Sequence, residues 1–159
     1  MPKRIYTAAY ASLRLSATDL DPMDVTSRLR LPPDHSHRAG EPNLVRSRSG
    51  RVVEYARYKQ GLWSMSSKQW VDSPVLETHI AWLLTQVEPR ADALRALLAA
   101  GVEGDIFCYS FGSAPKPPTV SRDLLHRAEA LGLRVDVDHY EGTAANEVVG
   151  PAKRSRVPQ

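Results

Sequence analysis

Two segments of the chain alternate apolar and polar residues, one near each end of the 159 residues. In residues 5–16 the Ile, Ala and Leu positions fall mainly on one face, and Tyr, Ser and Arg positions fall on the other. Residues 133–140 alternate in the same way, with Leu133, Val135 and Val137 on one face. A period of two is typical of a strand that buries one face. We therefore expect a β-strand in each segment.

Three more strands are predicted between these two. Residues 52–58 and 62–67 have strand character and flank Gln60-Gly61. That dipeptide favours a tight hairpin turn, because glycine accepts positive φ without strain. Residues 104–111 form the third strand, which carries aromatic residues at alternate positions.

Helical spacing and capping residues predict four helices. Asp21 can accept the free N–H groups at the start of the first helix, and Pro22 fits its first turn. Ser73-Pro74 opens the clearest helix, whose apolar residues recur at helical spacing. The four helices are expected over residues 21–31, 74–87, 91–100 and 121–131.

The predicted order of elements is β-α-β-β-α-α-β-α-β. This order favours an α+β fold, with a mostly antiparallel five-stranded sheet and helices packed on one face. Residues 1–140 then form a single domain. Residues 141–159 lack periodicity, contain several Gly and Pro residues and end in a basic cluster, so we expect a flexible C-terminal tail there.

Composition and charge exclude several classes of protein. Hydrophobic residues make up 42% and charged residues 25%, which excludes a disordered chain, a collagen-like fibre and a coiled coil. Residues 1–60 hold eleven Lys and Arg against six Asp and Glu, whereas residues 61–159 are slightly acidic. No apolar stretch is long enough to span a bilayer. We therefore expect a soluble, cytoplasmic protein with an electrostatically uneven surface, and nucleic acid is a disfavoured partner.

The residue types that carry chemistry do not form a recognisable reaction motif. Asp34, His35 and His37 are the best metal candidates, but a zinc site needs three or four ligands held rigidly, so we assign no metal. The single cysteine, Cys108, is expected to be a buried structural thiol. Phosphate-binding and dinucleotide-binding motifs are absent, and no cofactor is expected.

His79 leaves a second interpretation open. It borders the apolar face of its predicted helix, where a core-edge imidazole bonded to the backbone is the simpler explanation. Alternatively it is a base for Ser64 or Ser66, oriented by Asp72.

A long polar segment, residues 32–50, is the best candidate for contact with a partner. Connections of this length within a compact domain are usually functional or mobile. The candidate partner-binding residues lie in and after this segment, and they suit an acidic or phosphate-bearing surface through arginine and buried area through tryptophan. They are Arg38, Arg46, Arg48, Arg51, Trp63 and Trp70. For Trp63, core packing is the favoured role, because large aromatic residues dominate protein cores.

Several short motifs together resemble one family. They are Ala11–Ser16, Asp19–Pro22, Leu29–Pro33, His37–Glu41, Gly61–Ser64 and Leu76–Ile80, followed by Gly132-Leu133 and Asp136–Tyr140. In this order they resemble the bacterial domain of unknown function 4279 family over residues 8–140. The resemblance implies a small bacterial cytoplasmic α+β domain, and it carries over no catalytic residues. Some such small domains lie beside toxin genes, which suggests immunity proteins.

From these observations we expect a non-enzymatic protein-binding domain, an immunity protein that neutralises a cognate toxin. The alternative is a small-ligand-binding protein or an enzyme that uses the region around His79, Trp63 and Trp70. An enzymatic role is the less favoured of the two.

Overall fold

The computed structural model describes residues 5–143. Most of the predicted tail, residues 144–159, lies outside the described residues. The strands are β1 (Tyr6–Ala17), β2 (His35–His37), β3 (Asn43–Arg46), β4 (Val52–Tyr55), β5 (Gly61–Ser66), β6 (Glu103–Gly112) and β7 (Arg134–Glu141). The helices are α1 (Pro22–Leu29), α2 (Leu76–Val87), the 3₁₀ helix η1 (Glu88–Arg90), α3 (Ala91–Ala99) and α4 (Arg122–Ala130).

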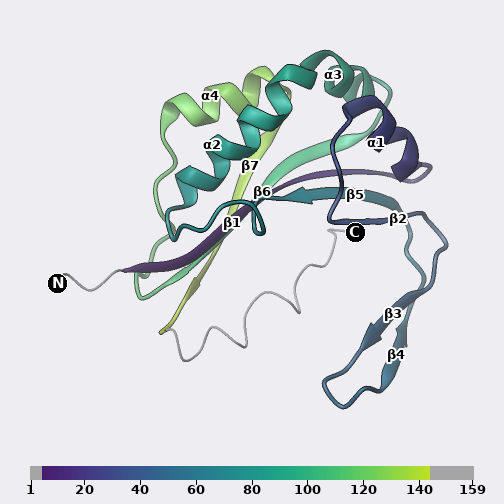
Figure 1. Ribbon diagram of the computed structural model, residues 1–159, viewed down its shortest axis with the longest axis horizontal. Helices are drawn as coiled ribbons and strands as arrows, with labels where there is room; N and C mark the ends of the chain where they lie inside the picture. Colours follow the sequence, from purple (N-terminus) through teal and green to yellow (C-terminus); the bar gives the residue numbers. More distant parts are fainter. Residues whose placement is uncertain (1–4, 144–159) are drawn as a thin grey trace.

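The described part of the chain contains a five-stranded sheet and a separate two-stranded sheet. The main sheet has the order β2-β5-β1-β6-β7, and all its pairs are antiparallel except β6 and β7, which are parallel. The helices cover one face of this sheet (Figure 1). The predicted α+β class with a mostly antiparallel five-stranded sheet is confirmed, and the parallel β6–β7 pair makes the sheet mixed.

Capping residues act at the helix starts much as predicted. The Asp21 carboxylate accepts a hydrogen bond from the Met23 N–H, and Pro22 occupies the first turn of α1. The Ser121 hydroxyl accepts from the Leu124 N–H at the start of α4. Helix α2 begins later than expected, because Ser73 caps a turn before it by accepting from the Val75 N–H.

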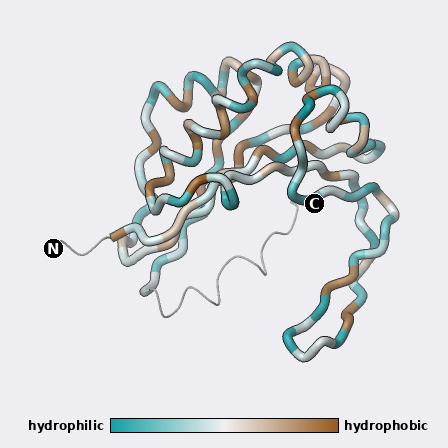
Figure 2. The backbone as a smooth tube through the Cα atoms, in the orientation of Figure 1, coloured by the Kyte–Doolittle hydropathy of each residue, from teal (hydrophilic) through white to brown (hydrophobic). Residues whose placement is uncertain are grey.

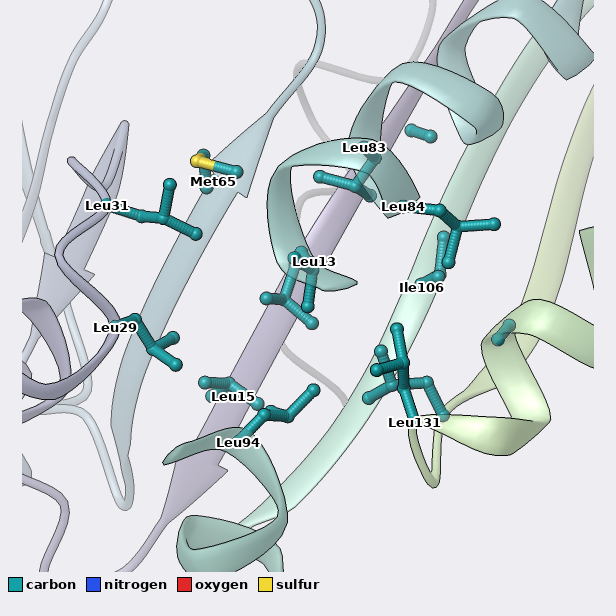
Figure 3. Close-up of a cluster of buried hydrophobic side chains, with 14 of the residues drawn as sticks. Leu13, Leu15, Leu29, Leu31, Met65, Leu83, Leu84, Leu94, Ile106 and Leu131 are labelled. Atoms are coloured by element: carbon teal, nitrogen blue, oxygen red, sulfur yellow. The ribbon is translucent and has the colours of Figure 1, made fainter. Parts of the chain in front are cut away.

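The core lies between the helices and the sheet (Figure 3). On the sheet, Leu13 of β1 lies opposite Met65 of β5 and Ile106 of β6. From the other side, Leu83 and Leu84 of α2 pack onto them, and all five side chains are buried. A buried leucine or isoleucine side chain contributes roughly 1.5–3 kcal/mol through loss of apolar surface from water. This layer therefore supplies the main stabilising free energy of the fold.

The identity of the fifth strand differs from the prediction. Residues 52–58 were expected in the main sheet, but β4 ends at Tyr55 and pairs only with β3. The fifth strand is β2, which pairs with β5. Gln60-Gly61 is not the hairpin turn of two main-sheet strands. Instead, a Cβ atom at Gly61 would lie 2.5 Å from the Leu20 carbonyl oxygen, so glycine permits close packing of β5 against that loop.

The face of the main sheet opposite the helices carries no helix in the described part of the chain, and we call it the open face (Figure 1). The aromatic residues of β6 that alternate in the sequence share this face, since they lie opposite Tyr10 and Ser12 of β1. None of the described helices is long and apolar enough to cross a membrane.

Candidate functional site

A two-stranded hairpin projects from the body on the side away from the helices (Figure 1). We call residues 43–55 the arm. Its strands β3 and β4 pair antiparallel, with Val45 opposite Val53 and Arg46 opposite Val52. The arm corresponds to the second half of the long polar segment singled out in the sequence, together with β4.

A tight turn closes the tip of the arm. The Gly50 N–H donates to the Ser47 carbonyl at 2.9 Å, and the Ser47 N–H donates to the Arg51 carbonyl at 2.7 Å. Gly50 has a φ of 82°, a left-handed conformation that glycine adopts without strain. The hydroxyls of Ser47 and Ser49 also lie 2.8 Å apart. These contacts hold the tip in one shape and direct its side chains outward.

Three arginines gather at this tip. Arg46 ends β3, Arg48 lies in the turn and Arg51 precedes β4, and all three are exposed. Within residues 5–143 none of the three forms an ion pair. The tip is therefore a compact positive patch whose guanidinium groups remain available to carboxylates or phosphates.

The strands behind the tip expose apolar side chains on both faces of the arm. Figure 2 shows these hydrophobic positions on a segment that stands clear of the body. The five exposed residues are Leu44, Val45, Val52, Val53 and Tyr55. The sequence analysis did not predict these five residues as part of the candidate surface, although β-branched residues that flank a Ser/Gly turn are a usual hairpin signal. Exposed apolar surface next to a charged rim is typical of an interaction surface.

The base of the arm is fastened to the body. The Gly40 N–H donates to the Tyr58 carbonyl at 2.7 Å, and the Arg57 guanidinium donates to the Gly40 carbonyl at 2.7 Å. The Tyr58 ring stacks on the His37 imidazole with centroids 3.4 Å apart. Arg38 forms an ion pair of 2.8 Å with Asp21, which the sequence did not foresee. Arg38 therefore helps to anchor the arm and lies apart from the arginines at the tip.

His37 is 4% exposed and neither of its ring nitrogens makes a hydrogen bond of good geometry in the described structure. Burial, followed by the neighbouring His35, lowers the pKa of His37, while the Glu41 carboxylate and nearby backbone carbonyls oppose this shift. Asp34, the third metal candidate, instead accepts hydrogen bonds from the Ser66 N–H and the Gln69 amide. Residues 5–143 contain no group of three or more side chains arranged to hold a metal ion.

The two tryptophans proposed for partner contact have different environments. Trp63 is 0% exposed, and its Nε1–H donates to the Thr26 hydroxyl at 3.0 Å. A fully buried indole presents no surface to a partner. Trp63 is therefore a core residue and is not one of the partner-binding residues. Trp70 is 60% exposed and stacks on Trp82 with centroids 6.2 Å apart.

Trp70 and the arm arginines lie at opposite ends of β5. The arm joins the body at the Gly61 end, and Trp70 follows the Ser66 end. A strand of this length spans roughly 16–20 Å. The structure therefore does not bring Trp70 next to Arg46, Arg48 and Arg51, although the sequence analysis predicted them as parts of one binding surface.

His79 is a structural residue at the junction of α2 and the loop after β5. Its Nε2 lies 2.8 Å from the Ser73 carbonyl, which can only accept, so Nε2 carries the proton. Its Nδ1 then accepts from the Ser67 hydroxyl at 2.7 Å, and that hydroxyl accepts from the Ala11 N–H at 3.0 Å. With both nitrogens engaged and 1% exposure, His79 has no atom to offer a substrate. Its serine partner is Ser67, and the structure gives no support to a base for Ser64 or Ser66.

Cys108 is buried in the centre of β6, as expected. Burial, together with the carboxylates of Asp105 and Asp136, raises the pKa of its thiol to about 12. The thiol is protonated at neutral pH and does not act as a nucleophile.

Comparison with known proteins places the chain in a family without assigning an activity. No curated protein and no solved structure matches the chain. The model of one family, described as "Domain of unknown function (DUF4279)", matches residues 7–142. This range covers β1 from its second residue onward and all of β2 to β7, and so includes the arm. The chain therefore belongs to the DUF4279 family.

Proposed function

We propose that this chain is a non-enzymatic protein-binding domain that engages its partner with the arm. One observation carries the proposal: the arm has both a basic tip and strands that expose apolar side chains. A soluble domain rarely leaves five large apolar side chains exposed on one small element unless another surface covers them.

The charge of the tip defines the chemistry of the partner. Arg46, Arg48 and Arg51 present three guanidinium groups without ion-pair partners in the described part of the chain. Guanidinium groups bind carboxylates in a planar, two-bond geometry. The partner therefore carries an acidic patch, and attraction between the two patches accelerates their encounter.

The exposed strands account for the affinity of the complex. A two-stranded hairpin is marginally stable in water on its own, and covering its apolar faces would stabilise it. Leu44 and Val52 point to one face of the arm, whereas Val45, Val53 and Tyr55 point to the other. An arm that inserts into a cleft can bury both faces at once. A toxin's active-site cleft with acidic walls fits this description, and we propose that the chain is a bacterial, cytoplasmic immunity protein for such a toxin.

Co-purification with the product of the adjacent gene tests this proposal. The full chain is co-expressed with that product, and binding kinetics are measured at low and high salt. The variant Arg46→Gln/Arg48→Gln/Arg51→Gln should associate about ten times more slowly at low salt. The difference should shrink at high salt, because salt screens exposed charges beyond about 8 Å at physiological ionic strength.

A matched variant controls for net charge. Arg28, Arg95 and Arg122 are exposed on the helices of the body, and replacing all three with Gln removes the same three charges. This control should bind like the parent. A partner that binds the parent and the arm variant equally at both salt concentrations, or a neighbouring product that does not bind at all, overturns the proposal.

A further inference from the structure

Strand β7 forms a free edge of the main sheet, far from the arm in the strand order. Within residues 5–143 it pairs only with β6. Its eight residues make it the longer of the two edge strands, because β2 at the other edge has three. The ladder between β6 and β7 runs without a register shift. A long, regular edge strand presents a row of unpaired backbone groups to which another chain can add a strand.

A hydrogen bond just after β7 shows which of its backbone groups face outward. The Gly142 N–H donates to the Gly112 carbonyl of β6 at 2.8 Å. Backbone groups alternate between the two sides of a strand, so the even-numbered residues of β7 bond to β6 and the odd-numbered residues point to the free edge. Val135, Val137 and His139 therefore present their N–H and C=O groups outward.

A hollow lies beside this edge, between α4 and the start of β7. Its volume is about 510 Å³, and its lining residues are Leu125, Glu129, Gly132, Leu133, Arg134 and Val135. All of them come from α4, β7 and the turn between these elements, so the hollow opens on the side of β7 that faces away from β6. Leu125 is 41% exposed. When a peptide adds to a sheet edge, pockets of this kind take its alternate side chains.

The side chains of β7 define the chemistry of a strand that fits this edge. Val135 and Val137 pack toward the core under the helices, whereas Asp136 and Asp138 lie on the open face. Asp136 pairs with Arg134, and Asp138 forms no ion pair within residues 5–143. Residues directly opposite each other in neighbouring strands share a face. A complementary strand therefore places aliphatic side chains opposite the two valines, and Lys or Arg opposite the two aspartates.

A second copy of the chain matches this edge poorly. The two-fold antiparallel registers that pair most of β7 with itself place Asp136 or Asp138 opposite another aspartate. Like charges directly opposite each other destabilise a strand pair. The charges of β7 therefore favour a strand from a different protein over a second β7.

We propose that the free edge of β7 binds an extended segment of a protein partner in which aliphatic residues alternate with Lys or Arg. The segment adds antiparallel to β7, exchanges backbone hydrogen bonds with Val135 and Val137, and packs an aliphatic side chain against Leu125. This edge prefers the opposite charge to the arm, which takes carboxylates. It shares no residue with the arm, so its test stands or falls separately from that of the proposed function.

A short peptide and two methylated forms of it test the site on the full chain. In acetyl-Thr-Lys-Val-Lys-Val-Thr-amide the lysines can lie opposite Asp138 and Asp136 while the valines lie opposite Val137 and Val135. Backbone amide NMR shifts on β7 and α4 should saturate below about 5 mM peptide. N-methylation of both valines removes the N–H groups that face β7 and should weaken binding at least about tenfold. N-methylation of both lysines alters N–H groups that face solvent and should leave the affinity within about twofold.

Two variants, each with a matched control, test the side chains. Leu125→Asn should weaken binding about three- to fivefold, because the peptide valine loses its apolar contact, whereas Leu44→Asn changes an exposed leucine of the arm and should bind like the parent. Asp138→Asn should weaken binding about threefold at low salt, whereas Asp92→Asn removes an exposed carboxylate of α3 and should not.

Three results would overturn the proposal. The first is the absence of saturable shifts on β7 up to about 10 mM peptide. The second is equal binding of the two methylated peptides, which is measured on the parent chain and does not depend on the folding of any variant. The third is an unchanged affinity in both Leu125→Asn and Asp138→Asn.

Discussion

The body and the arm use apolar residues in opposite ways. In the body, Leu13, Leu83 and Ile106 are fully buried between the sheet and the helices. In the arm, Leu44 is 58% exposed although it also lies in a strand. Apolar area removed from water stabilises the folded chain, whereas area left exposed can stabilise a complex. The difference separates stability, which resides in the body, from recognition, which we place in the arm.

The sharpest test of this contrast replaces one leucine in each region. Leu83→Ala removes a fully buried side chain and should lower the free energy of unfolding by about 2–5 kcal/mol. Leu44→Ala changes an exposed position and should alter it by less than about 0.5 kcal/mol. Urea denaturation of both variants measures the difference. Equal losses would mean that the arm belongs to the same packed unit as the body.

A smaller loss of stability is expected from a substitution at the junction of α2 and the loop after β5. His79→Ala removes the partner of the Ser67 hydroxyl and of the Ser73 carbonyl. Leaving buried polar groups unpaired should cost about 1–3 kcal/mol. Thermal unfolding measures this loss, with His126→Ala, at an exposed position of α4, as the control. A variant as stable as the parent would contradict the structural role of His79.

The free energy of unfolding should depend on pH through His37, which lies where the arm joins the body. The pKa of His37 is lowered in the folded chain from a usual value of 6.5, so the unfolded chain binds more protons just below that pH. The free energy of unfolding should therefore fall as the pH drops below about 6.5 and level off below the folded pKa.

His37→Phe keeps a ring to stack on Tyr58 but cannot titrate. Its free energy of unfolding should vary less than that of the parent between about pH 7.5 and pH 5. Urea denaturation at several pH values compares the two slopes, with His126→Phe as the exposed control. A variant whose slope equals the parent's would show that His37 does not titrate differently in the folded and unfolded chains.

Removal of the whole arm should also have only a small effect on stability. Replacing residues 43–55 with two glycines leaves the Gly40–Tyr58 hydrogen bond at the base in place. The free energy of unfolding should change by less than about 1 kcal/mol, because the removed strands pair only with each other. Calorimetry measures the change, and a large loss would make the arm part of the stabilising core.

The sequence predicts local structure well and long-range partnerships less well. The alternation that ends in Leu15 and the Asp21 cap depend on neighbours in the chain, and the structure confirms both. Residues 52–55 have strand propensity whichever strand they pair with, so the sequence could not show that β3 is their partner. The fifth strand is only three residues long, too short for any period to appear.

For the candidate site, too, the sequence predicts local features but not which residues meet in space. The arginine-rich segment was found because charge and length are visible in the sequence. The burial of Trp63 and the separation of Trp70 from the tip arginines depend on which elements meet in space. On the open face, Tyr10 of β1, Tyr109 of β6 and Tyr140 of β7 form one row of rings although they lie far apart in the sequence, and the strand order brings them together.

The most direct test of the account compares stability and affinity in the same molecule. The chain whose residues 43–55 are replaced with two glycines is titrated with the purified product of the adjacent gene by isothermal calorimetry, beside the parent. We expect the arm-deleted chain to stay folded, with nearly the parent melting temperature, and to bind at least about a hundred times more weakly. A folded arm-deleted chain that retains the parent affinity would contradict the assignment of recognition to the arm.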